Sequence, residues 1–122
     1  MKYAYIMRHG VYESGDSLIP SSEEYVKQNA RLIKSDLLDI EAITVFHSPA
    51  QRALVTANTV ANELNGIRVT LEAKTELDFN KYEIGHFLEK QKETCIVVSH
   101  EPDIKRITGE KLVSGSYVRW NF

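Results

Sequence analysis

The chain carries two arginines and two histidines at points where a short apolar run gives way to polar sequence. Arg8 and His9 stand at the end of the first run, Arg52 shortly after a second, and His100 directly after a later one. Guanidinium groups bind phosphoryl oxygens through charge-assisted hydrogen bonds, and a neutral imidazole is a competent nucleophile near neutral pH. The four side chains together therefore indicate binding of an anion, best fitted by a phosphoryl group, with covalent chemistry on one histidine.

Helix starts are predicted directly after two of these apolar runs. Ser48 is followed by a proline and stands three residues before Gln51, which is the spacing of a helix N-cap and its capping box. Arg52 would then lie in the first turn, where side chains lean back toward the helix N-terminus. His100 precedes Pro102 in the same strand–turn–helix manner. Both helix starts would offer free N–H groups and a positive dipole end to an anion.

These residues must be positioned by alternating strands and helices. The apolar run at 94–99 is typical of a central parallel strand that is covered on both faces. Strands alternating with helices predict an α/β fold with a largely parallel sheet, in which the strand ends bring these side chains to one edge. Strands are expected at about 2–7, 42–47, 67–72, 94–99 and 116–121, and helices at about 22–38, 49–64, 80–92 and from Pro102 onward.

Two local signals refine this scheme. Ser21 and Glu24 have capping-box spacing at the start of the first helix, and Gly85 weakens the third helix. The segment 11–20 directly follows the first arginine–histidine pair and is expected to be a polar loop.

Composition excludes several classes of protein. A length of 122 residues, with 43% hydrophobic residues, predicts one domain spanning 1–122. The net charge of −2 is spread along the chain, which argues against nucleic-acid binding, and no segment is predicted to be a signal peptide or membrane span. Cys95 is the single cysteine and is expected to be a small core residue. A cytoplasmic protein is the default expectation.

In the order of its motifs, the sequence resembles the histidine phosphatase superfamily, also called the phosphoglycerate mutase-like family. The resemblance rests on Arg8-His9-Gly10, Ser48-Pro49, Arg52-Ala53, Thr56-Ala57 and Ser99-His100 with Pro102. The short length looks most like the small SixA-type phosphohistidine phosphatases. The resemblance implies a three-layer α/β/α sandwich with a mostly parallel central sheet and no cap domain.

The same resemblance implies roles for individual residues. His9 would be the nucleophile, and Arg8, Arg52 and His100 would bind the phosphoryl group, with Ser48 as a further phosphate neighbour. No metal and no cofactor would be needed. The expected substrate is a phosphohistidine on a partner protein. The alternatives are a small phosphorylated metabolite, a mutase-like reaction, or a phosphate- or phosphoprotein-binding module without turnover. The oligomeric state stays open.

The proton donor is not fixed by the sequence. Many members of this family supply an acid from the loop after the third strand, where Glu76 and Asp78 are the candidates. Glu13 and Asp16, in the loop after the first strand, are others, and the small phosphohistidine phosphatases often lack a clear acid. A phosphoramidate needs less acid assistance than a phosphomonoester, because imidazole is a better leaving group than an alkoxide.

Three positions depart from the family pattern. His47 stands where a second serine is common, and is expected to pack at the strand end. The segment that begins at Leu18 lacks the usual Leu-Thr and following glycine, so that loop is expected to close differently. The stretch 103–115 is short, which predicts a brief last helix and an open site.

Overall fold

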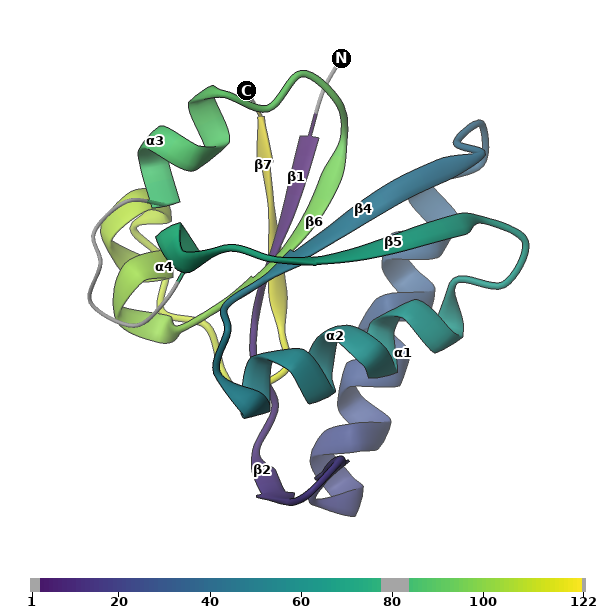
Figure 1. The fold of residues 1–122 in the computed structure, drawn as a ribbon, viewed down its shortest axis with the longest axis vertical. Helices are drawn as coiled ribbons and strands as arrows, with labels where there is room; N and C mark the ends of the chain where they lie inside the picture. Colours follow the sequence, from purple (N-terminus) through teal and green to yellow (C-terminus); the bar gives the residue numbers. More distant parts are fainter. Residues whose placement is uncertain (1–2, 78–83, 122) are drawn as a thin grey trace.

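The computed structural model describes residues 3–77 and 84–121, and arranges them as a twisted sheet between two helical layers (Figure 1). In chain order the elements are β1 (Tyr3–Arg8), β2 (Tyr12–Ser14), β3 (Ser17–Leu18), α1 (Pro20–Asp36), β4 (Ala42–His47), α2 (Gln51–Glu63), β5 (Arg68–Ala73), the 3₁₀ turn η1 (Thr75–Leu77), α3 (Ile84–Glu89), β6 (Cys95–Ser99), α4 (Glu101–Thr108) and β7 (Tyr117–Asn121).

The main sheet has the strand order β5-β4-β6-β1-β7, with the first four strands parallel and β7 antiparallel at one edge. In this register Arg8 pairs with Ser99, and His47 pairs with Val98. The carboxyl ends of β1, β4 and β6 therefore finish at the same edge of the sheet, as the sequence predicts, and the segments that follow them meet there.

The alternation of side chains along the strands builds a core on each face. On β1, Tyr5 and Met7 pack under α1 and α2, whereas Ala4 and Ile6 face the side covered by α3 and α4. Because the strand period is two, each central strand feeds both cores. This arrangement confirms the predicted three-layer α/β/α architecture, and no separate cap domain lies among the described residues.

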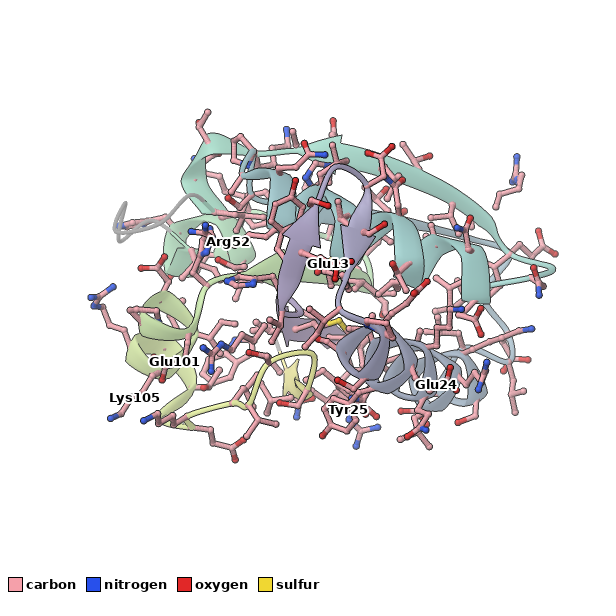
Figure 2. All side chains as sticks on the ribbon, turned by 90° about the horizontal axis from the view of Figure 1, so that it is seen from below. Glu13, Glu24, Tyr25, Arg52, Glu101 and Lys105 are labelled. Carbon is pink, nitrogen blue, oxygen red and sulfur yellow. The ribbon has the colours of Figure 1, made fainter. Side chains whose placement is uncertain are left out.

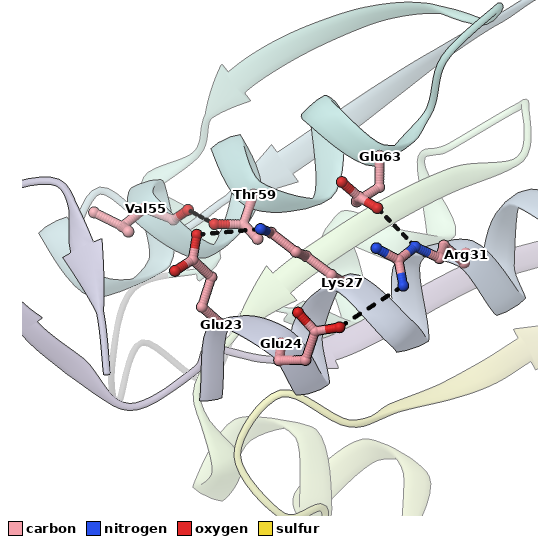
Figure 3. Close-up of polar contacts among 7 residues, drawn as sticks. All are labelled: Glu23, Glu24, Lys27, Arg31, Val55, Thr59 and Glu63. Atoms are coloured by element: carbon pink, nitrogen blue, oxygen red, sulfur yellow. Dashed lines mark hydrogen bonds and ion pairs between the residues drawn. The ribbon is translucent and has the colours of Figure 1, made fainter. Parts of the chain in front are cut away.

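A salt bridge on the surface connects the two helices of one layer, and two further pairs lie within α1 (Figure 3). Arg31 on α1 contacts Glu63 on α2 at 2.8 Å and Glu24 on its own helix at 3.8 Å. Lys27 and Glu23 add an i,i+4 pair at 3.6 Å. Exposed pairs of this kind contribute about 0–1 kcal/mol each, so the buried apolar faces hold α1 and α2 together.

The predicted starts of the first two helices were wrong in detail. The N-cap of α1 is Ile19, with a proline in the first turn, and Ser21 and Glu24 form no capping box. The N-cap of α2 is Ala50 rather than Ser48, and its side chain makes no cap hydrogen bond. Pro20 fixes the backbone dihedral that a first helical residue needs, which explains the early start of α1.

Segments outside the main strands also differ from expectation. The predicted polar loop 11–20 contains the hairpin β2–β3, in which Tyr12 pairs with Leu18. The third helix ends at Glu89, earlier than the predicted 92, and its predicted start at 80 lies outside the described residues. The last helix, α4, has 8 residues and ends at Gly109 in the left-handed conformation, which glycine adopts readily. Its brevity agrees with the sequence-based expectation.

Candidate active site

A pocket of about 460 Å³ lies at the carboxyl edge of the sheet. Among the described residues, its lining is formed by Arg8, His9, Arg52, His100, Glu101 and Pro102. The structure thus brings both arginines and both histidines singled out in the sequence into one hollow. β1, the first turn of α2 and the junction of β6 with α4 supply them.

The imidazole of His9 is held by its own backbone neighbourhood. Its Nδ1 lies 2.9 Å from the carbonyl oxygen of Gly10, and because a carbonyl only accepts, Nδ1 carries the proton. The unprotonated Nε2 then keeps its lone pair. Burial lowers the pKa of His9, the Gly10 hydrogen bond raises it, and the charges of Arg52 and Arg8 lower it further; the net shift is downward. The lowered pKa and the proton held on Nδ1 both favour a neutral ring with a nucleophilic Nε2.

A buried threonine connects the loop after His9 to α2. The hydroxyl of Thr56 accepts a hydrogen bond from the backbone N–H of Gly10 at 2.9 Å and donates one to the carbonyl of Arg52 at 2.8 Å. The nucleophile's loop and the arginine-bearing turn are therefore positioned by one side chain. Arg52 itself is exposed at the pocket and can reach a ligand without displacing packed groups.

Arg8 is oriented by the chain that follows α4. Its Nη1 donates to the carbonyl of Leu112 at 2.9 Å, and its backbone carbonyl accepts from the N–H of Gly115 at 3.0 Å. Its Nε is buried and has no hydrogen-bond partner among the described residues. An anion in the pocket would provide acceptors for such a guanidinium.

His100 lies deepest among these residues, with 1% of its surface exposed. Its Nε2 is 3.0 Å from the hydroxyl of Ser48, and its ring meets the ring of His9 edge to face at 5.1 Å between centroids. Ser48 is fully buried and is not among the residues that line the pocket, so it contacts His100 from within the protein interior. His47 is also buried, with Nδ1 2.8 Å from the carbonyl of Ser48, and is likewise not part of the lining.

Of the acids named from the sequence, the three that the structure describes, Glu13, Asp16 and Glu76, are not part of this lining. Glu76 is placed in η1 beside Thr75, and Asp78 lies outside the described residues. Glu13 and Asp16 are exposed on the hairpin. Among the described residues, the acid that lines the pocket is Glu101, which the sequence analysis missed.

Glu101 had a recognisable sequence signal. It directly follows His100 and is the first residue of α4. Side chains in a first helical turn lean toward the N-terminus, so a residue at this position faces the same edge as His100. Figure 2 shows Glu101 on the same side of the molecule as Arg52, whereas Glu24 is on the opposite side, on α1.

Other features of the described part of the chain offer less chemistry. A second hollow of about 460 Å³ is lined by Gly85, Leu88, Glu89, Ile107, Trp120 and Asn121, a described set without a histidine or a cationic side chain. Within residues 3–77 and 84–121, no three His, Cys, Asp or Glu side chains are grouped closely enough to hold a metal ion. Likewise, none of the helices described is both long and apolar enough to span a bilayer.

Solved structures with the same architecture identify the fold. The protein histidine phosphatase SixA, solved with tungstate, superposes with a TM-score of 0.69 at 22% identity, covering 98% of this chain and 94% of that one. The fold is the histidine phosphatase fold. A phosphoglycerate mutase from Plasmodium falciparum gives a TM-score of 0.67 at 16% identity, covering 99% of this chain and 89% of the mutase.

A phosphatase named for a small-molecule substrate has the same fold. The mycobacterial glucosyl-3-phosphoglycerate phosphatase gives a TM-score of 0.70 at 9% identity, covering 98% of this chain and 90% of the other. No family model and no curated protein matches the sequence itself. At these identities the likeness establishes the fold, and the reaction has to be argued from the site.

Proposed function

We propose that this protein is a phosphatase that forms a covalent phosphohistidine on His9 and hydrolyses phosphohistidine carried by a partner protein. The observation that carries the proposal is the hydrogen bond from His9 Nδ1 to the Gly10 carbonyl, in a pocket shared with Arg8, Arg52 and His100. This hydrogen bond leaves Nε2 unprotonated, in a pocket whose two arginines favour an anion.

The proposed reaction has two displacements at phosphorus. His9 Nε2 attacks, the bond between phosphorus and the leaving group breaks, and the leaving group keeps the electron pair. Water then attacks the phosphorylated His9, the new P–N bond breaks, and dihydrogen phosphate leaves with both protons of that water. The proton stays on Nδ1 throughout, donated in the hydrogen bond to the Gly10 carbonyl. Arg8 and Arg52 would stabilise the charge on the phosphoryl oxygens in both transition states.

An open pocket supports a protein substrate. Among the residues that the structure describes, no cap domain covers the edge where Arg52 is exposed, so a side chain displayed on a folded surface can enter. The fold shared with SixA, which is described as a protein histidine phosphatase, adds support. The second candidate is a small phosphomonoester, favoured by the fold shared with the glucosyl-3-phosphoglycerate phosphatase.

The deciding experiment is a paired assay with phosphohistidine and p-nitrophenyl phosphate. His9→Ala should lower turnover by at least about a thousandfold, because it removes the nucleophile. It should still bind vanadate, since both arginines remain. His86→Ala is the matched control, because that imidazole lies on α3 with 82% of its side chain exposed and should leave both rates unchanged.

The outcomes separate the candidates. The proposal is supported if the wild type, but not His9→Ala, acquires an acid-labile phosphoryl group and if phosphohistidine is the better substrate. Preference for the ester points to a small phosphomonoester. Vanadate binding without turnover of either compound indicates a binding module, and full turnover by His9→Ala contradicts the covalent mechanism. EDTA should leave the rate unchanged, because no step uses a metal.

A further inference from the structure

Glu101 places a negative charge in a pocket that otherwise suits an anion. Glu101 is one of the residues that line the same hollow as Arg8, His9, Arg52 and His100. The residue is half-buried, and its Oε1 is shielded from solvent without a hydrogen-bond partner among the described residues. A shielded carboxylate oxygen that lacks a donor is unfavourable in free energy, so a ligand that brings a donor would be stabilised there.

This carboxylate is not used to balance the arginines of the site. The ion pairs among described residues engage Arg31, Arg106 and Arg119, but none joins Glu101 to Arg8 or Arg52. The neighbouring acid Asp103 differs, since it is bonded to Arg106 at 3.0 Å and is not part of the pocket lining. Glu101 is therefore available for a ligand.

A phosphoryl group is the wrong partner for this side chain. Glu101 is the first residue of α4, where the helix dipole favours a negatively charged side chain. A carboxylate repels phosphoryl oxygens, which the two arginines are suited to hold. The part of a bound substrate that a carboxylate can stabilise is a leaving group that carries a proton on nitrogen.

We propose that Glu101 contacts the leaving group and selects phosphoramidates, whose leaving nitrogen heterocycle or amine is protonated, over phosphate esters; this inference rests on the proposed function. With phosphohistidine, Glu101 would accept a hydrogen bond from the ring nitrogen that does not carry phosphorus. That nitrogen is protonated in the form whose P–N bond breaks most readily.

The step balances without an added proton. His9 Nε2 attacks phosphorus, the P–N bond of the protonated substrate ring breaks, and the electron pair stays on the departing nitrogen. The substrate leaves as neutral imidazole with its other nitrogen still protonated, held by Glu101, while the phosphorylated ring of His9 carries the positive charge. An alkyl ester would leave as an alkoxide and needs a proton, which an ionised carboxylate does not hold.

The test is the ratio of kcat/KM for phosphohistidine to that for p-nitrophenyl phosphate. Glu101→Gln keeps the size of the side chain and removes the charge. It should lower kcat/KM on phosphohistidine about tenfold or more, as expected for loss of a charged hydrogen bond, and leave the aryl ester unchanged or faster. Glu110→Gln removes a charge from an exposed position beyond α4 and should leave the ratio unchanged.

Binding of inorganic vanadate gives a second, turnover-free readout. Glu101→Gln should bind vanadate more tightly than wild type, because a repulsive charge has been removed. An unchanged ratio and unchanged vanadate affinity in a folded Glu101→Gln protein would overturn the assignment. Failure of the proposed function would give a different result from failure of the Glu101 assignment. The wild type would then turn over neither compound, or turnover would survive His9→Ala.

Discussion

The hydroxyl of Thr56 accepts a hydrogen bond from the backbone N–H of Gly10 at a distance of 2.9 Å. The two residues are far apart in sequence, and the contact is buried. The same hydroxyl donates to the carbonyl of Arg52 at 2.8 Å. Thr56 therefore couples the position of the proposed nucleophile's loop to that of the arginine beside it, without lining the pocket itself.

Replacing Thr56 by valine should weaken both stability and activity. Valine keeps the shape but leaves the buried Gly10 N–H without an acceptor, which costs about 1–3 kcal/mol of unfolding free energy. Turnover of p-nitrophenyl phosphate should fall, and Thr56→Ser should recover both properties. Thr59→Val is the matched control, since Thr59 is half-buried one turn later and its hydroxyl donates to the Val55 carbonyl of its own helix. An equal effect of both valine variants would argue against the positioning role.

The downward shift of the His9 pKa predicts a characteristic pH dependence. Burial is the main cause, and the charges of Arg52 and Arg8 add to it. Because neutral His9 is the proposed nucleophile, the acidic limb of kcat/KM should have its midpoint below the ordinary value of 6.5. An NMR titration of the His9 ring should give the same midpoint, and a midpoint above 6.5 would contradict the shift.

The same shift makes a prediction for stability. The folded pKa lies below the unfolded one, so the unfolded chain binds a proton first as the pH falls. The contribution of His9 is therefore fully present above about pH 6.5 and is lost as the pH falls from there through the folded pKa. Denaturant titrations should show a smaller loss of stability between pH 7 and 5 in His9→Gln than in wild type.

The fold and the assembly of the site were predictable because both depend on which segments form strands, and apolar runs in the sequence identify those segments. The apolar run that ends at Ser99 and the apolar run along β1 identify strands, and the carboxyl ends of parallel strands meet at one edge of the sheet. Arg8, His9 and His100 therefore had to meet once the strands were recognised. The pocket lining agrees with that expectation.

Local detail was harder because side chains had competing partners. Ser48 has the sequence of a helix cap, but its hydroxyl contacts the His100 imidazole and the N–H of Ala50, and the helix starts later. The hairpin β2–β3 is too short and polar to give a strand pattern. Glu101 was overlooked because acids in the first turn of a helix usually have an electrostatic role that is local to that helix.

Cys95 should be inert in the folded protein. Burial raises the pKa of its thiol to about 12, so almost no thiolate exists near neutral pH. Ellman's reagent at pH 8 should label native protein only at the rate of opening or unfolding, and should label denatured protein at once. Rapid labelling of the native protein, with intact circular dichroism, would contradict the buried position on β6.

Glycine is required at position 10 because neighbouring atoms leave no room for a Cβ, and not because the backbone angle is unusual. A Cβ added there would lie 2.8 Å from both Leu18 Cδ1 and Ser22 Oγ, and that hydroxyl accepts the N–H of Val11. Gly10→Ala must therefore displace the buried side chains of Leu18 and Ser22, which pack against the loop that carries the proposed nucleophile. Overpacking of this kind costs about 1–3 kcal/mol, and a displaced His9 should also reduce turnover.

A second glycine provides the control for this prediction. Among the described residues, a Cβ on Gly85 would meet only Ile107 Cδ1 at 3.7 Å, which is ordinary contact. Gly85→Ala should stabilise α3 by about 0.5–1 kcal/mol, because alanine favours the helix, and should leave turnover unchanged. Thermal unfolding and p-nitrophenyl phosphate hydrolysis of the two variants test the contrast. If Gly10→Ala retained wild-type stability and rate, the close packing of β3 and α1 against Gly10 could not be what holds His9 in place.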